Sequence, residues 1–418
     1  MNDSSLKKNK ALLILMAFVI YSVICKYFQA NNRDSGGIYL QNMLKMEAVI
    51  VIPLFCYTLK AYRQRVFNYA NSFIDFLIIY LSANILNTII FSPSYDYILI
   101  DVIYWMSFVS FFYLGTNPKF WKYFVKTILI ILIISSVLSL KEIVYGGNLS
   151  YLRSEVGINA ESYLYDIQIG FSVSSFALIY YYFNHNNRER SIAIATFVLY
   201  FFLQFYFQKR LPLARVLFTL FVLIYLVRKT NVTAKISLGY YFLIPLLMIM
   251  AFTYIPKELI DATVDRFFEN GSATETVVND GRYKILDAVL SHTLSSPRTI
   301  LFGEGTGGCA IGNFDSKYIT VAGQFVQGVS EFEVGWCSYF FRYGIIFLIV
   351  FYKFLYKNIR GVRIDYTDQL SIACWGQILI LFVFSILGES FPNVSVPIST
   401  ILLASSLGYL STKNRQTV

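Results

Sequence analysis

Hydrophobic residues along this chain form long, continuous runs separated by short polar segments. Most runs are about 18 to 22 residues long, close to the length that an α-helix needs to cross a bilayer. Continuous runs favour membrane helices over the strands of an outer-membrane barrel, in which inward and outward residues alternate. The pattern predicts twelve helices, at about 11–28, 43–59, 73–91, 97–115, 123–140, 163–183, 191–207, 212–227, 236–255, 334–352, 370–387 and 396–410.

The polar segments divide the chain into three parts. Residues 1–255 hold the first nine runs, 256–333 form a long loop, and 334–418 hold the last three runs and a tail. The long loop has roughly 80 residues and is the one segment large enough to fold as a cap over the membrane. We therefore expect an all-α polytopic membrane protein with about 12 transmembrane helices and one large loop between the ninth and tenth.

Positive charge gathers in every second loop, which fixes the expected orientation. Cytoplasmic loops of membrane proteins carry an excess of lysine and arginine. We therefore expect both termini in the cytoplasm and the 256–333 loop outside it. The basic residues behind this prediction are Lys7, Lys8, Lys10, Lys60, Arg63, Arg65, Lys119, Lys122, Lys126, Arg188, Arg190, Arg228, Lys229, Lys235, Lys353, Lys357, Arg360, Arg363, Lys413 and Arg415.

Composition supports the membrane assignment and narrows the chemistry. Hydrophobic residues make up 56% of the chain and charged residues 14%, against about 25% charged in soluble domains. This composition excludes an ordinary soluble enzyme and a disordered protein. The net charge of +10 does not indicate a nucleic-acid binder, because most of the basic residues belong to the orientation signal. Two histidines and five cysteines without a Cys-x-x-Cys pair predict no metal site and no disulfide framework. We expect no cofactor.

One short outer hairpin is basic, against the rule for that side. It carries Lys209, Arg210 and Arg215, and Pro212 suits the first turn of a helix. The free N–H groups of a helix start bind anions. The cations could contact lipid headgroups or pair with a buried acid. The interpretation that we favour is that they hold a phosphorylated ligand together with the helix start.

The long loop contains two further candidate features. Arg282 stands at the start of a helix predicted from Ile285 to Leu290, and His292 stands at its end, as a candidate base. The segment 303–308 has the letters of a Gly-x-Gly-x-x-Gly motif. No helix pattern and no lysine follow it, so we expect a tight turn there, not a dinucleotide site.

Two carboxylates close the loop at the outer edge of the tenth helix. Glu331 and Glu333 come just before an apolar run, where burial would raise a carboxyl pKa toward the range of a general base. The alternative is a salt bridge to an arginine of the loop.

Several of these features together resemble a known family. The chain resembles bacterial O-antigen polymerases of the Wzy type, in the superfamily that includes O-antigen ligases. The likeness rests on the twelve runs with one long outer loop and on three motifs within about 205–345. The motifs are Lys209-Arg210 with Arg215; Gly281-Arg282 followed by Ser296-Pro297 and Leu301-Phe302-Gly303-Glu304-Gly305; and Glu333-Val334-Gly335-Trp336 with Arg342-Tyr343-Gly344-Ile345.

The resemblance implies a GT-C-like membrane glycosyltransferase that polymerises oligosaccharide repeat units carried on undecaprenyl diphosphate, at the outer face of the inner membrane. It implies that Arg210, Arg215 and Arg282, beside Lys209, hold the diphosphate. Relatives in the ligase branch place a histidine where this chain has Glu333, and this departure weakens the ligase interpretation. Glu333 is our first choice of catalytic base, ahead of Glu331 and His292. The implied partners are lipid-linked glycans, membrane lipid and a chain-length regulator protein.

Other functions fit parts of the sequence. An O-antigen ligase would share the diphosphate site and use a different acceptor. A flippase for lipid-linked oligosaccharides would also have about twelve spans, but its charges would be spread through two repeated halves. A sensor or structural membrane protein would carry out no chemistry.

Overall fold

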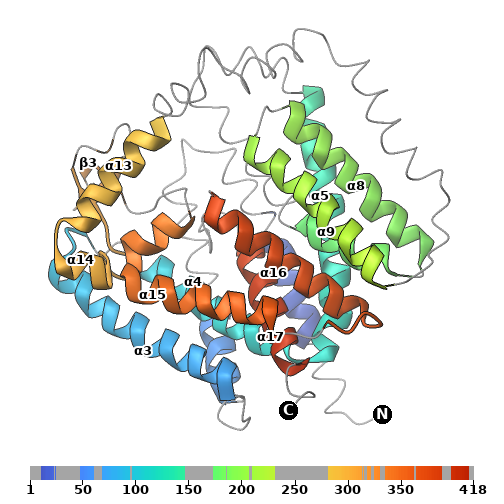
Figure 1. The fold of residues 1–418 in the computed structure, drawn as a ribbon, viewed down its shortest axis with the longest axis horizontal. Helices are drawn as coiled ribbons and strands as arrows, with labels where there is room; N and C mark the ends of the chain where they lie inside the picture. The colour runs from blue at the N-terminus through green and yellow to red at the C-terminus, as the bar shows by residue number, and fades with distance from the viewer. Residues whose placement is uncertain are drawn as a thin grey trace.

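A computed structural model gives the architecture of much of the chain (Figure 1). Helices dominate it, and they run through the described parts of eleven of the twelve expected runs. The ninth run lies outside the described residues, so the number of membrane crossings stays a prediction. The structure describes residues 11–22, 24, 48–60, 68–94, 97–145, 173–184, 186–206, 210–230, 281–312, 314, 318–321, 324–329, 335–361, 364–387 and 397–413.

The helices follow the apolar runs closely. Helical segments at Ala11–Ser22, Ala48–Lys60 and 173–182 accompany the longer helices. Apolar runs predict where a helix lies better than where it begins or ends. The helix α5 begins at Pro118, before the expected residue 123, and α9 begins at Arg210, before Pro212. The longer helices are α3 (Asn68–Phe91), α4 (Ile98–Gly115), α5 (Pro118–Tyr145), α8 (Asn187–Tyr206), α9 (Arg210–Thr230), α15 (Gly335–Arg360), α16 (Gln369–Leu387) and α17 (Pro397–Lys413).

Five of the described helices are long and apolar enough to cross a membrane. They comprise most of α3, all of α4, the first part of α5, all of α15 and most of α16. Apolar side chains such as Ile79 and Ile90 of α3 stay exposed on the outside of the bundle, as lipid-facing residues do. The protein is thus an all-α membrane protein in its main body.

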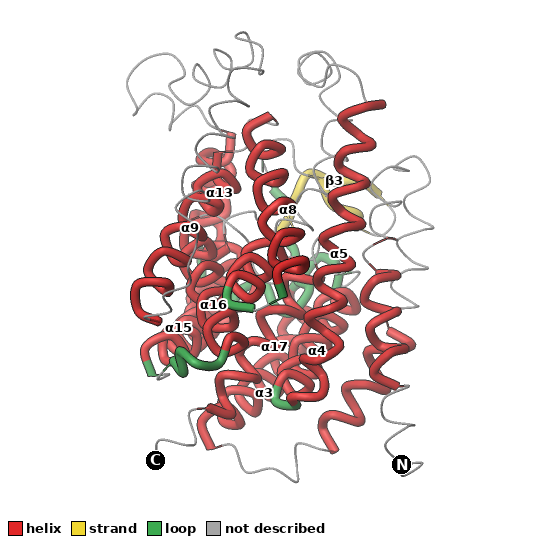
Figure 2. The backbone as a smooth tube through the Cα atoms, turned by 90° about the vertical axis from the view of Figure 1, so that its right-hand side faces the viewer, coloured by secondary structure: helices red, strands yellow, loops and turns green. Residues whose placement is uncertain are grey.

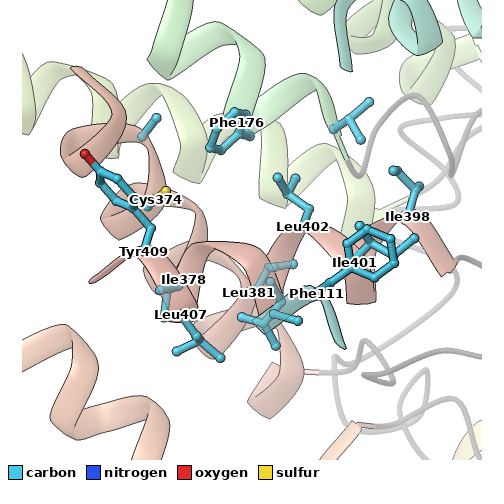
Figure 3. Close-up of a cluster of buried hydrophobic side chains, with 14 of the residues drawn as sticks. Phe111, Phe176, Cys374, Ile378, Leu381, Ile398, Ile401, Leu402, Leu407 and Tyr409 are labelled. Carbon is cyan, nitrogen blue, oxygen red and sulfur yellow. The ribbon is translucent and has the colours of Figure 1, made fainter. Parts of the chain in front are cut away.

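The core of the bundle lies where α4, α16 and α17 meet. Figure 3 shows Phe111 of α4, Leu381 of α16 and Leu402 of α17 in one buried cluster. Small residues let α4 and α17 approach closely, as is common between membrane helices. A Cβ on Gly408 would lie 1.9 Å from the carbonyl oxygen of Phe112, and one on Gly115 would lie 2.2 Å from that of Ser405.

Part of the long loop folds against one end of this bundle. It contains α13 (Gly281–Leu294), α14 (Pro297–Phe302) and three short antiparallel strands in the order β1-β3-β2. The strands are β1 (Ala310–Ile311), β2 (Tyr318–Val321) and β3 (Gln324–Val329). Figure 2 shows them as the small strand patch in an otherwise helical molecule. The helix at α13 was predicted, whereas the strands were not.

The opposite end collects the basic ends of several helices, and we call it the basic end. The ring of Trp121, in the first turn of α5, lies 5.8 Å from that of Tyr409, in the last turns of α17. The indole N–H of Trp375 in α16 donates to the carbonyl of Ile359 near the end of α15, at 2.9 Å. These contacts gather helix ends that carry Lys122, Lys126, Lys357, Arg360 and Lys413.

Candidate functional site

The expected phosphate-binding residues are only partly within the described structure. Arg210 and Arg282 lie in the first turns of α9 and α13, as the sequence predicted for Arg282, but their side chains lie outside the described part. Lys209, Glu331 and Glu333 also lie outside the described residues. The grouping of the three arginines around one ligand therefore stays a prediction.

Arg215 is buried within the helical bundle. Its side chain is 3% exposed, more than a turn beyond the start of α9. Its carbonyl accepts a hydrogen bond from the hydroxyl of Thr219 at 2.8 Å, and that hydroxyl pairs with Ser175 of the neighbouring helix at 3.0 Å. Burying a guanidinium is costly in free energy unless other groups compensate its charge. A buried arginine such as Arg215 therefore usually has a structural or functional role.

The glycine-rich segment, residues 303–309, is a buried turn that joins α14 to β1; we call it the glycine loop. Gly303, Gly305 and Gly307 have positive φ angles of 68°, 102° and 72°, a region that residues with a Cβ rarely adopt. A Cβ on Gly303 would lie 2.5 Å from the backbone of Arg342, and one on Gly307 2.4 Å from that of Ile98. Glycine is therefore needed both for backbone conformation and for close approach to the bundle.

Polar side chains of α3 hold the glycine loop. The amide of Asn84 donates to the carbonyl of Phe302 at 3.0 Å, and the amide of Asn87 donates to that of Gly303 at 3.2 Å. The hydroxyl of Thr88 donates to the carbonyl of Thr306 at 3.0 Å. Buried backbone carbonyls need such donors, and α3 supplies them from one face of its last turns.

A break in α15 supplies the acceptors for the other side of the loop. Gly344, with φ 74° and ψ −179°, is not helical, so the carbonyls before it are released from the helix ladder. The N–H of Glu304 donates to the carbonyl of Phe341, and that of Gly305 to the carbonyl of Arg342, both at 2.8 Å. The break in the helix and the turn in the loop therefore fit each other.

A buried ion pair lies beneath the loop. Arg342 of α15 donates through Nη1 to Oδ1 of Asp101 in α4 at 2.9 Å, and both residues are at most 6% exposed. Oδ2 of Asp101 accepts from the N–H of Gly307 at 2.7 Å and from the hydroxyl of Tyr343 at 2.9 Å. The indole of Trp105 donates to that hydroxyl at 2.9 Å. The carboxylate thus has three donors, as a buried charge requires.

Glu304 connects the loop to two side chains that reach solvent. Its Oε1 lies 2.9 Å from Nε2 of His292 at the end of α13, and its Oε2 lies 3.5 Å from Nη2 of Arg298 in α14. The side chain of Glu304 is 5% exposed, whereas those of His292 and Arg298 are 34% and 29% exposed. Arg298 also donates to Oδ1 of Asn87 at 3.2 Å.

This arrangement can support proton transfer. A carboxylate that hydrogen-bonds one ring nitrogen orients a histidine and leaves the other nitrogen to a reactant. His292 was predicted from the sequence as a candidate base, and the structure adds Glu304 and Arg298 beside it. Among the described residues, no group of three His, Cys, Asp or Glu side chains could hold a metal ion.

Asp101 and Glu304 were missed by sequence reasoning. Asp101 is a lone carboxylate inside the apolar run 97–115, a signal that marks a paired or functional group in a membrane helix. Glu304 stands between two glycines, a pattern that predicts a backbone turn and does not indicate a role for the side chain.

Comparisons of the chain with protein-family models, with curated proteins and with solved structures returned no match. Function is therefore argued from the residues and their geometry.

Proposed function

We propose that this protein polymerises oligosaccharide repeat units carried on undecaprenyl diphosphate, as a membrane glycosyltransferase that makes O-antigen or a related surface polysaccharide. The observation that carries the proposal is the His292–Glu304–Arg298 cluster, held at one end of an apolar helical bundle by the buried contacts of the glycine loop. A lipid-linked substrate has its reacting group at the membrane surface, where such a cluster can meet it.

The proposed topology has about twelve crossings, cytoplasmic termini and the long loop in the periplasm, in the bacterial inner membrane. The support for this topology is that basic residues gather at one end of the bundle and the long loop packs at the other. Lys122, Lys126 and Lys413 belong to the basic end, whereas α13 and the glycine loop pack at the end where α4 begins. Basic loops stay on the cytoplasmic side.

In the proposed reaction, the acceptor sugar hydroxyl attacks the anomeric carbon of the donor glycan. A new C–O glycosidic bond forms, the C–O bond to the lipid diphosphate breaks, and the hydroxyl proton passes to a base. Arg210, Arg215 and Arg282, with Lys209, would stabilise the negative charge of the departing diphosphate, because the guanidinium fork matches phosphate oxygens and stays charged.

Three side chains are candidates for the base. Glu333 and Glu331 follow from the sequence pattern, and His292 has the described geometry in its favour. The contact with Glu304 gives the imidazole a fixed orientation. A positioned base contributes about 10²–10⁴-fold to a rate.

Variants in cells that lack the native gene test the proposal. We expect Arg210→Ala, Arg215→Ala and Arg282→Ala each to abolish long glycan chains while the protein still inserts, measured by gel analysis of surface polysaccharide and by membrane protein level. Arg188→Ala is the matched control, because Arg188 is exposed at the start of α8, and it should keep normal chain lengths. Wild-type chains from two of the three variants at normal expression would refute the diphosphate assignment.

The base is tested separately. We expect His292→Ala to lower the polymerisation rate by about 10²–10⁴-fold if His292 is the base, with Glu304→Gln lowering it less. Loss of activity in Glu333→Gln with near-normal activity in His292→Ala would assign the base to Glu333 instead.

A further inference from the structure

A cavity of about 400 Å³ opens at the basic end of the bundle, away from the glycine loop. It lies between the first turns of α5, the helix 173–182 and the segment that leads into α8, with Leu370 of α16 at its edge. A cavity of this size holds a phosphorylated headgroup. Nothing in the proposed transfer reaction uses it.

The cavity has an excess of positive charge. Lys122 and Lys126 line it from one face of α5, since residues four apart on a helix are neighbours. Glu189 is the acidic residue in the lining, and its Oε2 accepts from the amide of Asn184 at 3.3 Å. Within the described structure, no ion pair joins either lysine to Glu189. Both lysines are exposed, and neither forms an ion pair with another described residue.

The remaining wall is apolar and rigid. Trp121 is 2% exposed, and its indole N–H is already used by the carbonyl of Gly115 at 2.8 Å. Its ring stacks on Phe176 at 5.8 Å, and Tyr181 donates to the carbonyl of Val125 at 3.2 Å. An apolar aromatic wall beside two cations suits an amphipathic molecule better than a small, fully hydrated anion.

We propose that this cavity binds the phosphate group of an anionic glycerophospholipid, with Lys122 and Lys126 as the phosphate-binding residues and the aromatic wall against the glycerol and upper acyl chains. Basic pockets between membrane helices on the cytoplasmic side bind anionic headgroups in this way. A soluble phosphate ester has the same binding group, so the test separates the two sources.

The test uses the purified full-length protein in an uncharged detergent, with binding followed by native mass spectrometry. The probes are a short-chain phosphatidylglycerol, a phosphatidylcholine with the same chains, and glycerol 3-phosphate. The variants are Lys122→Gln with Lys126→Gln, Glu189→Gln, and the control Lys353→Gln with Lys357→Gln. The control pair has the same spacing, is exposed near the end of α15 and does not line the cavity.

We expect phosphatidylglycerol to bind more tightly than phosphatidylcholine. The Lys122 and Lys126 double variant should bind phosphatidylglycerol roughly 30-fold more weakly, since each nearby lysine contributes about fivefold. The control pair should bind as the wild type does, and Glu189→Gln should bind more tightly. Equal affinity for the two lipids, or an unchanged affinity in the double variant, would overturn the proposal. Equal binding of glycerol 3-phosphate would overturn the lipid as the source.

Discussion

The glycine-loop end of the bundle contains a fully buried ion pair beneath the loop, whereas the basic end carries exposed lysines around a cavity. Asp101 and Arg342 illustrate the first case, with 2% and 6% exposure and a 2.9 Å contact. Lys122 and Lys126 illustrate the second. A buried ion pair holds the elements that carry it in one arrangement. Exposed lysines can instead contact lipid headgroups. The buried pair fixes the position of the loop, and the exposed lysines belong to the lipid site that we propose at the other end.

The largest effect should come from filling the close approach at Gly344. Its φ is 74°, and a Cβ there would lie 2.2 Å from the carbonyl oxygen of Leu301. We expect Gly344→Ala to cost about 4 kcal/mol or more, because both the backbone and α14 must shift. Thermal unfolding in detergent measures this. Gly312→Ala is the control, since its nearest neighbour is a Phe314 ring atom at 3.1 Å. Similar unfolding temperatures for both variants would contradict the interpretation.

A slightly smaller loss is expected from breaking the buried ion pair. Asp101→Asn leaves the buried guanidinium of Arg342 without its counter-charge, and Arg342→Met leaves the buried carboxylate of Asp101 without one. Either substitution costs about 3–4 kcal/mol. The double variant should lose less than the sum of the two, because neither charge then remains. A double-mutant cycle on thermal unfolding measures the coupling. Additive losses would mean that the two side chains do not depend on each other.

The smallest effect is expected at the basic end. Lys413 and Asp368 form an ion pair at 3.0 Å with partly exposed side chains. Exposed pairs contribute about 0.2–1 kcal/mol and weaken as salt rises. We expect Lys413→Ala to change stability by this small amount at low salt and by less at high salt. A loss as large as that of Asp101→Asn would remove the contrast between the two ends.

The sequence predicted the parts of the fold that depend on local pattern. The apolar runs located α3, α4, α15 and α16, and the apolar residues of one face predicted α13. They could not predict the strands β1 to β3, which are short and depend on pairing with one another. The glycine loop was predicted as a turn, but its position follows from contacts with α3, more than 200 residues away in the chain, and with α15, 37 residues away.

The sequence predicted some residues of the candidate site but not the residues that they contact. A histidine at the end of α13 is visible in the sequence, whereas its contact with Glu304 depends on how α14 and the glycine loop turn back. The same holds for Asp101, whose three donors come from α15 and from the loop. Only tertiary structure brings these residues together.

Reconstitution tests the central claim most directly. The purified protein is placed in liposomes with lipid-diphosphate-linked repeat units isolated from cells that lack its gene, and the products are separated by length. We predict a ladder of lipid-linked glycans that lengthens with time and is absent for the Arg282→Ala variant. Repeat units that stay unjoined, with folded and inserted wild-type protein, would contradict the account.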